Sequence, residues 1–269
     1  MIRSDFHIHT NFTDGADSAE EMVIAAIEAG IETLGFSEHA YVPFDPDFCL
    51  SPETSVLYRN EISRLKSKYD EKIELLCGIE MDIDSPDDPD KYDYVIGSVH
   101  YLSAGGKVYS IDLSPQETAA CVSEGFGGSY ESYAEAYFEK VSRLKEVTHA
   151  DIIGHFDLIS KFEASKAAPD ISCGRCKRAW KSAVSELSGK AVFEINTGGI
   201  SRGYKKEAYP SPDILDELYR LNGKIVLSSD SHGKKHLLYG FEQAELSVRK
   251  HGFTCAGFTD RFGKYHKQF

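Results

Sequence analysis

Short apolar segments rich in β-branched residues alternate with segments of helical periodicity along nearly the whole sequence. This alternation is typical of a parallel sheet whose strands are connected by helices packed on its outside. Seven strand–helix units in one chain favour a closed α/β barrel over an open sheet. The expected strands are residues 5–9, 31–37, 72–81, 92–101, 150–155, 190–196 and 224–232, with a further short one at 254–258. The expected helices are residues 18–31, 55–69, 115–126, 129–147, 176–189, 211–223 and 235–252.

The composition fits one globular unit of this size. The chain has 269 residues, of which 41% are hydrophobic and 27% charged, and no segment reads as a linker. We therefore predict a single domain over residues 1–269, with an insertion between residues 101 and 130, where two Gly-Gly pairs flank an extra helix. The N-terminus lacks the apolar core of a signal peptide and no apolar run reaches membrane-spanning length, so we expect a cytoplasmic protein with no membrane partner.

The net charge of −13, with no basic run, argues against a nucleic-acid partner. It leaves open a small anionic substrate, because a bound metal ion can reverse the local field.

Six of the ten histidines lie at the ends of the expected strands. His7 and His9 are two residues apart, so in an extended chain both side chains point to the same face. Two carboxylates share this placement, and the complete set is His7, His9, His39, Glu80, His100, His155, Asp230 and His232. In a parallel barrel the carboxyl ends of the strands converge on one face, where active sites are built. The repeated placement predicts a metal site.

The number of donors exceeds what one ion needs, since zinc takes four ligands and a catalytic zinc keeps one position for water. Eight or nine donors suit two to three metals bridged by a carboxylate. Imidazole with carboxylate accepts zinc, iron or manganese, so the metal stays open. The remaining histidines, His149, His236, His251 and His266, are interpreted as structural or surface residues. Cys173 and Cys176 form a lone CxxC, typical of a redox pair or half a zinc site, but they are interpreted as reduced thiols at a helix start.

The motifs around these donors resemble the PHP (polymerase and histidinol phosphatase) family of metal-dependent phosphoesterases. They are "HIHTNFTDG", "SEHA", "GIEMD", "GSVHY", "IGHFD" and "SSDSH", which occur in the order of the family. The resemblance implies a distorted seven-stranded (βα) barrel with three metals. It assigns His7, His9, Glu80 and Asp230 to the first metal, Glu80 with His100 and His155 to the second, and His39 with His232 to the third. Some members have a histidine as the remaining ligand of the third metal, and here Asp14 is the nearest candidate.

Within the family, the length and the segments "GSVHYL…YSID" and "IGHFDLISKF" look most like histidinol-phosphate phosphatases. This implies hydrolysis of the phosphate monoester L-histidinol phosphate, a step of histidine biosynthesis, with a metal-activated hydroxide as nucleophile. The expected catalytic residues are Glu80, Asp230, His232 and Arg202. Arg202 and Lys161 follow strands on the loops of the expected face and are candidate phosphate contacts. Asp112 and Tyr101, near the insertion, could meet the ammonium and the imidazole of the substrate.

Three alternatives remain at this point. The chain could be a PHP phosphoesterase of another phosphate ester, or a metal-dependent amidohydrolase, whose barrel also begins with HxH. Amidohydrolases usually need a bridging lysine or carboxylate and a late lone aspartate, whereas the late motif here is "DSH". A non-catalytic metal-stabilised binding domain is the third, and lost ligands would mark that case.

Overall fold

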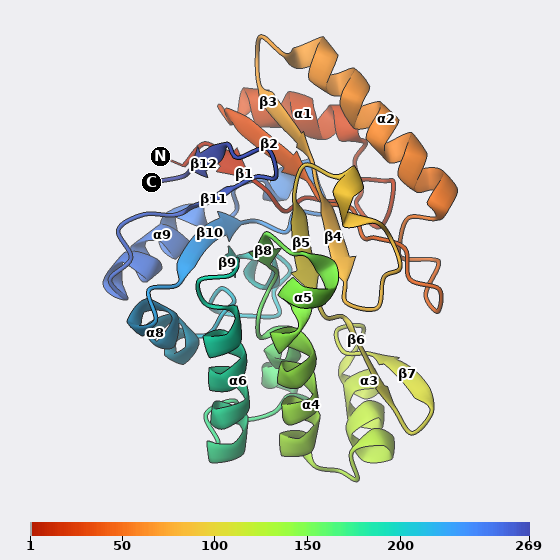
Figure 1. Cartoon of the computed structure of the whole chain (residues 1–269), viewed down its shortest axis with the longest axis vertical. Coiled ribbons are helices and arrows are strands. Elements are labelled where there is room, and N and C mark those ends of the chain that lie inside the picture. The colour runs from red at the N-terminus through yellow and green to blue at the C-terminus, as the bar shows by residue number, and fades with distance from the viewer. Residues whose placement is uncertain (1) are drawn as a thin grey trace.

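The computed structural model describes residues 2–269 and shows parallel strands wrapped by helices (Figure 1). The strands form two parallel sheets, with the orders β1-β2-β3 and β10-β9-β8-β5-β4. The first sheet comprises β1 (Ser4–Asp5), β2 (Thr33–Phe36) and β3 (Glu74–Cys77). The second comprises β4 (Ile79–Asp82), β5 (Val95–Ser98), β8 (Ile152–Ile153), β9 (Val192–Asn196) and β10 (Lys224–Ser228).

Two single-residue bridges join these sheets into a barrel. Ile8 pairs in parallel with Ser231, beyond the ends of β1 and β10, and His39 pairs in parallel with Glu80. Because β3 and β4 follow each other with only Gly78 between them, they occupy one position in the barrel wall. Counted in this way, the wall has seven strand positions along residues 2–269, which confirms the predicted distorted (βα)7 barrel.

The strand expected over residues 72–81 is therefore broken at Gly78, and the reason is steric. A Cβ atom at Gly78 would lie 2.3 Å from the ring of Tyr94. The Tyr94 hydroxyl shares its one proton between two carbonyl oxygens, that of Phe6 at 2.5 Å and that of Phe36 at 3.0 Å. A buried tyrosine thus ties neighbouring strands together, and only glycine leaves room for its ring.

Helices cover the outside of the barrel (Figure 1). The helices of the described residues are α1 (Ala19–Glu28), α2 (Pro52–Tyr69), α3 (Pro115–Ala120), α4 (Tyr130–Ser142), α5 (Leu144–Thr148), α6 (Gly174–Leu187), α7 (Gly198–Ser201), α8 (Pro212–Arg220) and α9 (Phe241–Lys250), of which α3 belongs to the insertion. Helix α1 begins with a capping box, in which Ser18 and Glu21 satisfy each other's backbone N–H groups. The predicted start of the last helix at residue 235 is wrong, because Gly240 adopts a φ of +70° and α9 begins only after it.

The barrel interior is filled by a small cluster of buried apolar side chains: Phe6, Leu76, Tyr94, Ile96, Ile152, Val192, Val226 and Phe258. Phe258 belongs to a C-terminal hairpin of β11 (Gly257–Thr259) and β12 (Tyr265–Lys267). The short strand expected at 254–258 begins later, and its partner β12 was not predicted. Gln268 binds the carbonyls of Ser4 and Leu227, so the two ends of the chain lie side by side (Figure 1).

The segment expected as an insertion leaves the barrel directly after His100. It forms an antiparallel hairpin of β6 (Tyr101–Ala104) and β7 (Lys107–Ser110), followed by α3 and a π-helical turn, Cys121–Gly125. The hairpin and α3 lie together below the strands in the view of Figure 1.

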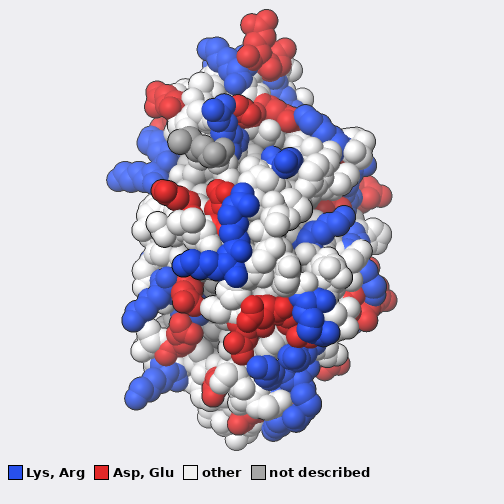
Figure 2. Space-filling model, turned by 90° about the vertical axis from the view of Figure 1, so that its left-hand side faces the viewer, with Lys and Arg blue, Asp and Glu red and all other residues white. Residues whose placement is uncertain are grey.

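The face shown in Figure 2 carries basic and acidic side chains interspersed, with no broad basic area. Along residues 2–269, none of the helices is both long enough and apolar enough to cross a bilayer.

Candidate metal centre

All nine predicted donors lie together at the carboxyl end of the barrel strands. The bridge between Ile8 and Ser231 places His7 and His9 beside Asp230 and His232. The bridge between His39 and Glu80 places these two donors beside each other, where β2 meets β4. The structure thus brings together every candidate metal donor that the sequence singled out, including Asp14. Their action as metal ligands stays a prediction.

Glu80 lies at the middle of the cluster with imidazoles on both of its carboxylate oxygens. Its side chain is 1% exposed. Oε2 lies 3.2 Å from Nε2 of His7, 3.4 Å from Nε2 of His9 and 3.0 Å from Nδ1 of His39. Oε1 lies 3.2 Å from Nε2 of His100 and 2.8 Å from Nε2 of His155. A carboxylate placed in this way can hold two cations at once, which matches the bridging role that the resemblance implies.

Asp230 completes a second group with the first two histidines. Its Oδ1 lies 3.8 Å from Nε2 of His7 and 3.6 Å from Nε2 of His9, and the two imidazole nitrogens are 3.1 Å apart. Within residues 2–269, the buried Nδ1 atoms of His9 and His155 form no hydrogen bond. Converging nitrogen and oxygen donors with buried, unpartnered nitrogens fit a transition metal.

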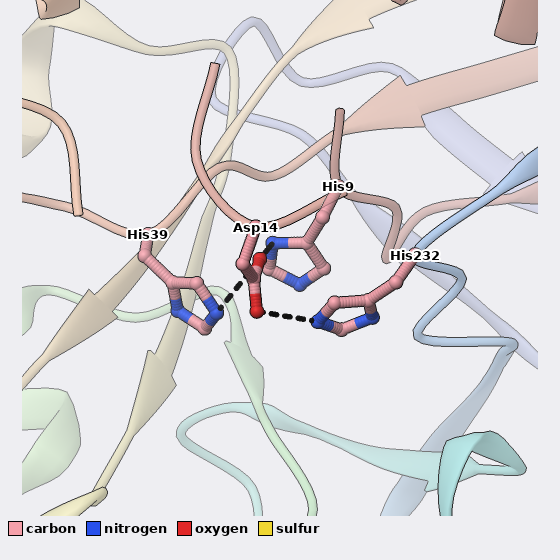
Figure 3. A group of neighbouring side chains, drawn as sticks. All are labelled: His9, Asp14, His39 and His232. Carbon is pink, nitrogen blue, oxygen red and sulfur yellow. Dashed lines mark ion pairs between the residues drawn. The ribbon is translucent and has the colours of Figure 1, made fainter. Parts of the chain in front are cut away.

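Asp14 lies among three histidines, as Figure 3 shows. Its Oδ2 is 3.0 Å from Nε2 of His232, and its Oδ1 is 3.7 Å from Nε2 of His39 and 3.8 Å from Nδ1 of His9. Asp14 therefore stands where a fourth donor beside His39 and His232 is expected. His9 faces this group as well as the group of Asp230, which the motif comparison did not anticipate.

The electrostatics of the cluster differ from one donor to the next. Burial opposes protonation of His7 and His100, but the neighbouring carboxylates outweigh it and raise the pKa of both imidazoles, so these two must release a proton when they bind a metal. Burial, together with the neighbouring His232 and His39, lowers the pKa of His9 well below its usual value, so this imidazole is neutral at pH 7. Burial opposes ionisation of Glu80, but the surrounding His7 and His100 outweigh it and lower the pKa of the carboxyl. A neutral imidazole and an ionised carboxylate are the forms that coordinate metals.

Glu194 is a buried carboxylate that sequence reasoning missed. Its Oε1 accepts a 2.6 Å hydrogen bond from Nδ1 of His7, and its Oε2 accepts one of 2.7 Å from the backbone N–H of His155. With Nδ1–H engaged, the lone pair of His7 Nε2 points to the cluster, which is the usual way a protein orients a metal-binding histidine. The available signal was an acid inside the apolar strand segment "VFEIN", two residues before Asn196.

Glu38 is the second missed residue, directly before His39. It accepts hydrogen bonds from the backbone N–H of Thr10, at 2.9 Å, and from the hydroxyls of Thr10 and Thr13. Burial raises the pKa of Glu38 to about 7. These bonds hold the loop that leads from His9 to Asp14.

The predicted phosphate contacts lie at the edge of the cluster. Arg202 donates from Nη2 to Oδ2 of Asp230 at 2.8 Å and from Nη1 to the Asp230 carbonyl at 2.9 Å. Lys161 donates to the carbonyl of Asp112 at 2.7 Å and pairs with its carboxylate at 3.1 Å. Contact of either cation with phosphate stays a prediction.

A cavity of about 210 Å³ opens from the cluster to the surface. Asp14, His39, Glu80 and His100 of the cluster are among the residues that line it. Its walls include the four further residues Asp45, Phe48, Lys161 and Tyr204, together with Tyr101 and Asp112, the predicted substrate contacts of the insertion.

The residues interpreted as structural lie outside the cluster. His149 ends α5 in a left-handed conformation, His236 lies in a short 3₁₀ turn, and His251 and His266 pair with Asp216 and Asp260. Cys173 caps the N-terminus of α6 by accepting a hydrogen bond from the backbone N–H of Cys176, and both thiols are free.

The chain forms a seven-stranded barrel with six imidazoles and three carboxylates at the carboxyl ends of its strands. This arrangement is typical of metal-dependent enzymes built on α/β barrels. Residues 5–198 match the model of the PHP domain, and the chain belongs to this family.

Three similar proteins show how far the likeness extends. A Schizosaccharomyces pombe protein named "Probable histidinol-phosphatase" is 30% identical, over 87% of this chain and 81% of the relative. A Deinococcus radiodurans protein of the same name is 28% identical over 96% of each chain. A crystal structure of histidinol phosphate phosphatase from Lactococcus lactis, complexed with zinc, L-histidinol and phosphate, has a TM-score of 0.71 and 23% identity. That comparison covers 98% of this chain and 99% of the other.

Proposed function

We propose that this protein is a phosphoric monoester hydrolase that converts L-histidinol phosphate to L-histidinol and phosphate. We further propose that it uses two to three divalent transition metals, namely zinc, iron or manganese. The observation that carries the proposal is the position of Glu80, with imidazoles on both oxygens and a cavity opening beside it. The histidinol-phosphatase names of relatives that align with most of the chain support the substrate.

In this proposal each donor group holds one metal. His7, His9, Glu80 and Asp230 hold the first, Glu80 with His100 and His155 holds the second, and His39, His232 and Asp14 hold the third. When bound, the metals supply an activated water and neutralise the phosphoryl oxygens of the displacement.

The other side chains of the site orient these donors and the phosphate. Glu194 fixes the ring of His7 through Nδ1. Arg202 fixes the carboxylate of Asp230 and supplies a planar cation beside the donors, which can meet the phosphate. Lys161 adds a second positive charge on the cavity wall.

The test is phosphate release from a panel of substrates by metal-loaded protein. The panel contains histidinol phosphate, a neutral aryl monoester and a phosphodiester. We expect the highest kcat/KM for histidinol phosphate and little turnover of the diester. A protein loaded with metal that releases no phosphate from histidinol phosphate would contradict the proposal.

A further inference from the structure

The cavity beside the metal centre is lined by charged side chains of both signs. Its cation is Lys161, whose ammonium lies 4.9 Å from the centre of the Tyr204 ring. Its acids include Asp45, which lines the cavity with Phe48 on the loop that follows His39. A cavity with a cation on one wall and a carboxylate on another fits a substrate that is negative at one end and positive at the other.

Asp45 is an acid of this cavity whose charge has no basic partner. Across residues 2–269 it forms no ion pair, and its Oδ2 accepts a 2.8 Å hydrogen bond from the hydroxyl of Tyr101. The hydroxyl is the donor of this bond, because an ionised carboxylate can only accept. Oδ1 of Asp45 is left free to accept a hydrogen bond from a ligand.

Asp112, the other candidate, is already compensated. Its Oδ2 pairs with Lys161 at 3.1 Å, and its Oδ1 accepts a hydrogen bond from Ser110 at 3.1 Å. Burial opposes ionisation of Asp112, but Lys161 and His100 outweigh it and bring its pKa down to about 2. A second cation at Asp112 would have to compete with the ammonium of Lys161.

The loop that carries Asp45 is held by hydrogen bonds at its base and within it. The backbone N–H of Leu50 donates to the carbonyl of His39 at 2.9 Å, which closes the loop against the metal centre. Inside the loop, the thiol of Cys49 donates to the carbonyl of Asp45 at 3.3 Å and accepts from the N–H of Val42 at 3.3 Å. The carboxylate is therefore presented from a closed turn, and ordering it on binding costs little.

Aromatic rings lie on the same loop and in the same cavity as the free carboxylate. The ring of Phe44 packs edge-on against Tyr101, with centroids 4.9 Å apart, and Phe48 lines the cavity with 48% of its surface exposed. Aromatic faces beside a carboxylate attract ammonium and imidazolium groups.

We propose that Asp45, positioned by Tyr101, binds the positively charged end of the substrate and selects amine-bearing phosphate monoesters over neutral ones. The inference rests on the proposed function, since it assigns the leaving-group end of the same site. It gives Asp112 the different role of holding Lys161 at the cavity wall.

The experiment compares histidinol phosphate with 4-nitrophenyl phosphate, using metal-loaded wild type, D45N and D47N. Asn keeps an acceptor for the Tyr101 hydroxyl but removes the charge. Asp47 is the matched control, because it is an exposed acid two residues further along the same loop. A hydrogen bond between charged groups is worth a factor of about ten to a hundred, so D45N should lower the preference for histidinol phosphate by that factor. D47N should keep the preference of wild type.

Product inhibition supplies a second readout, which a general distortion of the site would not produce. We expect D45N to raise the inhibition constant of L-histidinol more than that of inorganic phosphate. D112N should instead penalise both substrates to a similar degree, because it releases Lys161.

The outcomes separate the two proposals. A D45N enzyme that prefers histidinol phosphate as strongly as D47N does would overturn the role of Asp45 and leave the proposed function standing. Loss of that preference in D112N but not in D45N would do the same. A wild-type enzyme with no preference for histidinol phosphate would overturn the proposed substrate, and this inference with it.

Discussion

Replacing Glu194 by Gln tests whether the buried carboxylate behind His7 prepares the metal centre. The variant keeps the size of the side chain and removes its charge. In the structure Oε1 lies 2.6 Å from Nδ1 of His7, and Oε2 lies 2.7 Å from the backbone nitrogen of His155. A hydrogen bond to a charged group contributes about 1.5–3 kcal/mol. Each 1.4 kcal/mol of binding free energy changes the affinity by about a factor of ten, so loss of this hydrogen bond should weaken metal binding by about tenfold to a hundredfold. Residues that orient metal ligands typically have effects of this size.

The assay is a titration of apoprotein with Zn²⁺ in a metal buffer, followed by activity and by calorimetry. Glu186→Gln is the matched control, because Glu186 is an exposed acid of α6 that pairs with Lys190, away from the cluster. We expect the E194Q titration curve to move to higher free metal while the control curve stays in place. Thermal unfolding of both apoproteins checks that the variant is folded. A folded E194Q protein that binds metal as tightly as wild type would refute the positioning role of Glu194.

Three further predictions follow from the same contacts. Glu80→Gln should lose bound metal and at least about a hundredfold in rate, because it removes the charge shared by the two donor groups, and elemental analysis with kcat measures both. Arg202→Ala should lower kcat/KM by about tenfold to a hundredfold and weaken metal binding, because the guanidinium holds the carboxylate of Asp230. A raised KM with unchanged metal affinity would mean that Arg202 binds the phosphate and does not position Asp230. Burial opposes ionisation of Asp260, but the hydrogen bond from His266 outweighs it and lowers its pKa from the ordinary value of 3.8. The ionised Asp260 therefore stabilises the folded protein above pH 3.8, and this contribution is lost as the pH falls through the folded pKa. Urea unfolding should give wild type a larger free energy of unfolding than D260N at pH 7, and the difference should disappear below about pH 4.

The cluster of candidate donors could be predicted from the sequence because all of them except Asp14 lie at or near the end of an expected strand. The i, i+2 spacing of His7 and His9 and the repeated placement of a histidine after an apolar run both depend on local geometry. Parallel strands in a barrel end on the same face, so the placement also implied that the donors converge. The closure of the barrel between β1 and β10 joins segments far apart in the sequence. It could be predicted because the chain contains seven strand–helix units.

Other features depend on contacts that a sequence does not display. Gly78 interrupts a strand because the ring of Tyr94 needs its space. Glu194 lies inside an apolar strand, and its role appears only when His7 is brought against it from 187 residues away. The pairing of Asp112 with Lys161 spans 49 residues and changes which acid of the cavity is free. In each case the partner is set by packing between elements, which local patterns do not encode.

The central claim is that hydrolysis of histidinol phosphate depends on metals held by this cluster. The most direct measurement combines elemental analysis with phosphate release on one sample, before chelation, after chelation and after metal is restored. The account predicts two to three transition-metal ions per chain, loss of phosphate release with the chelator, and recovery when zinc, iron or manganese is returned. Full hydrolysis of histidinol phosphate by protein shown to contain no metal would contradict it.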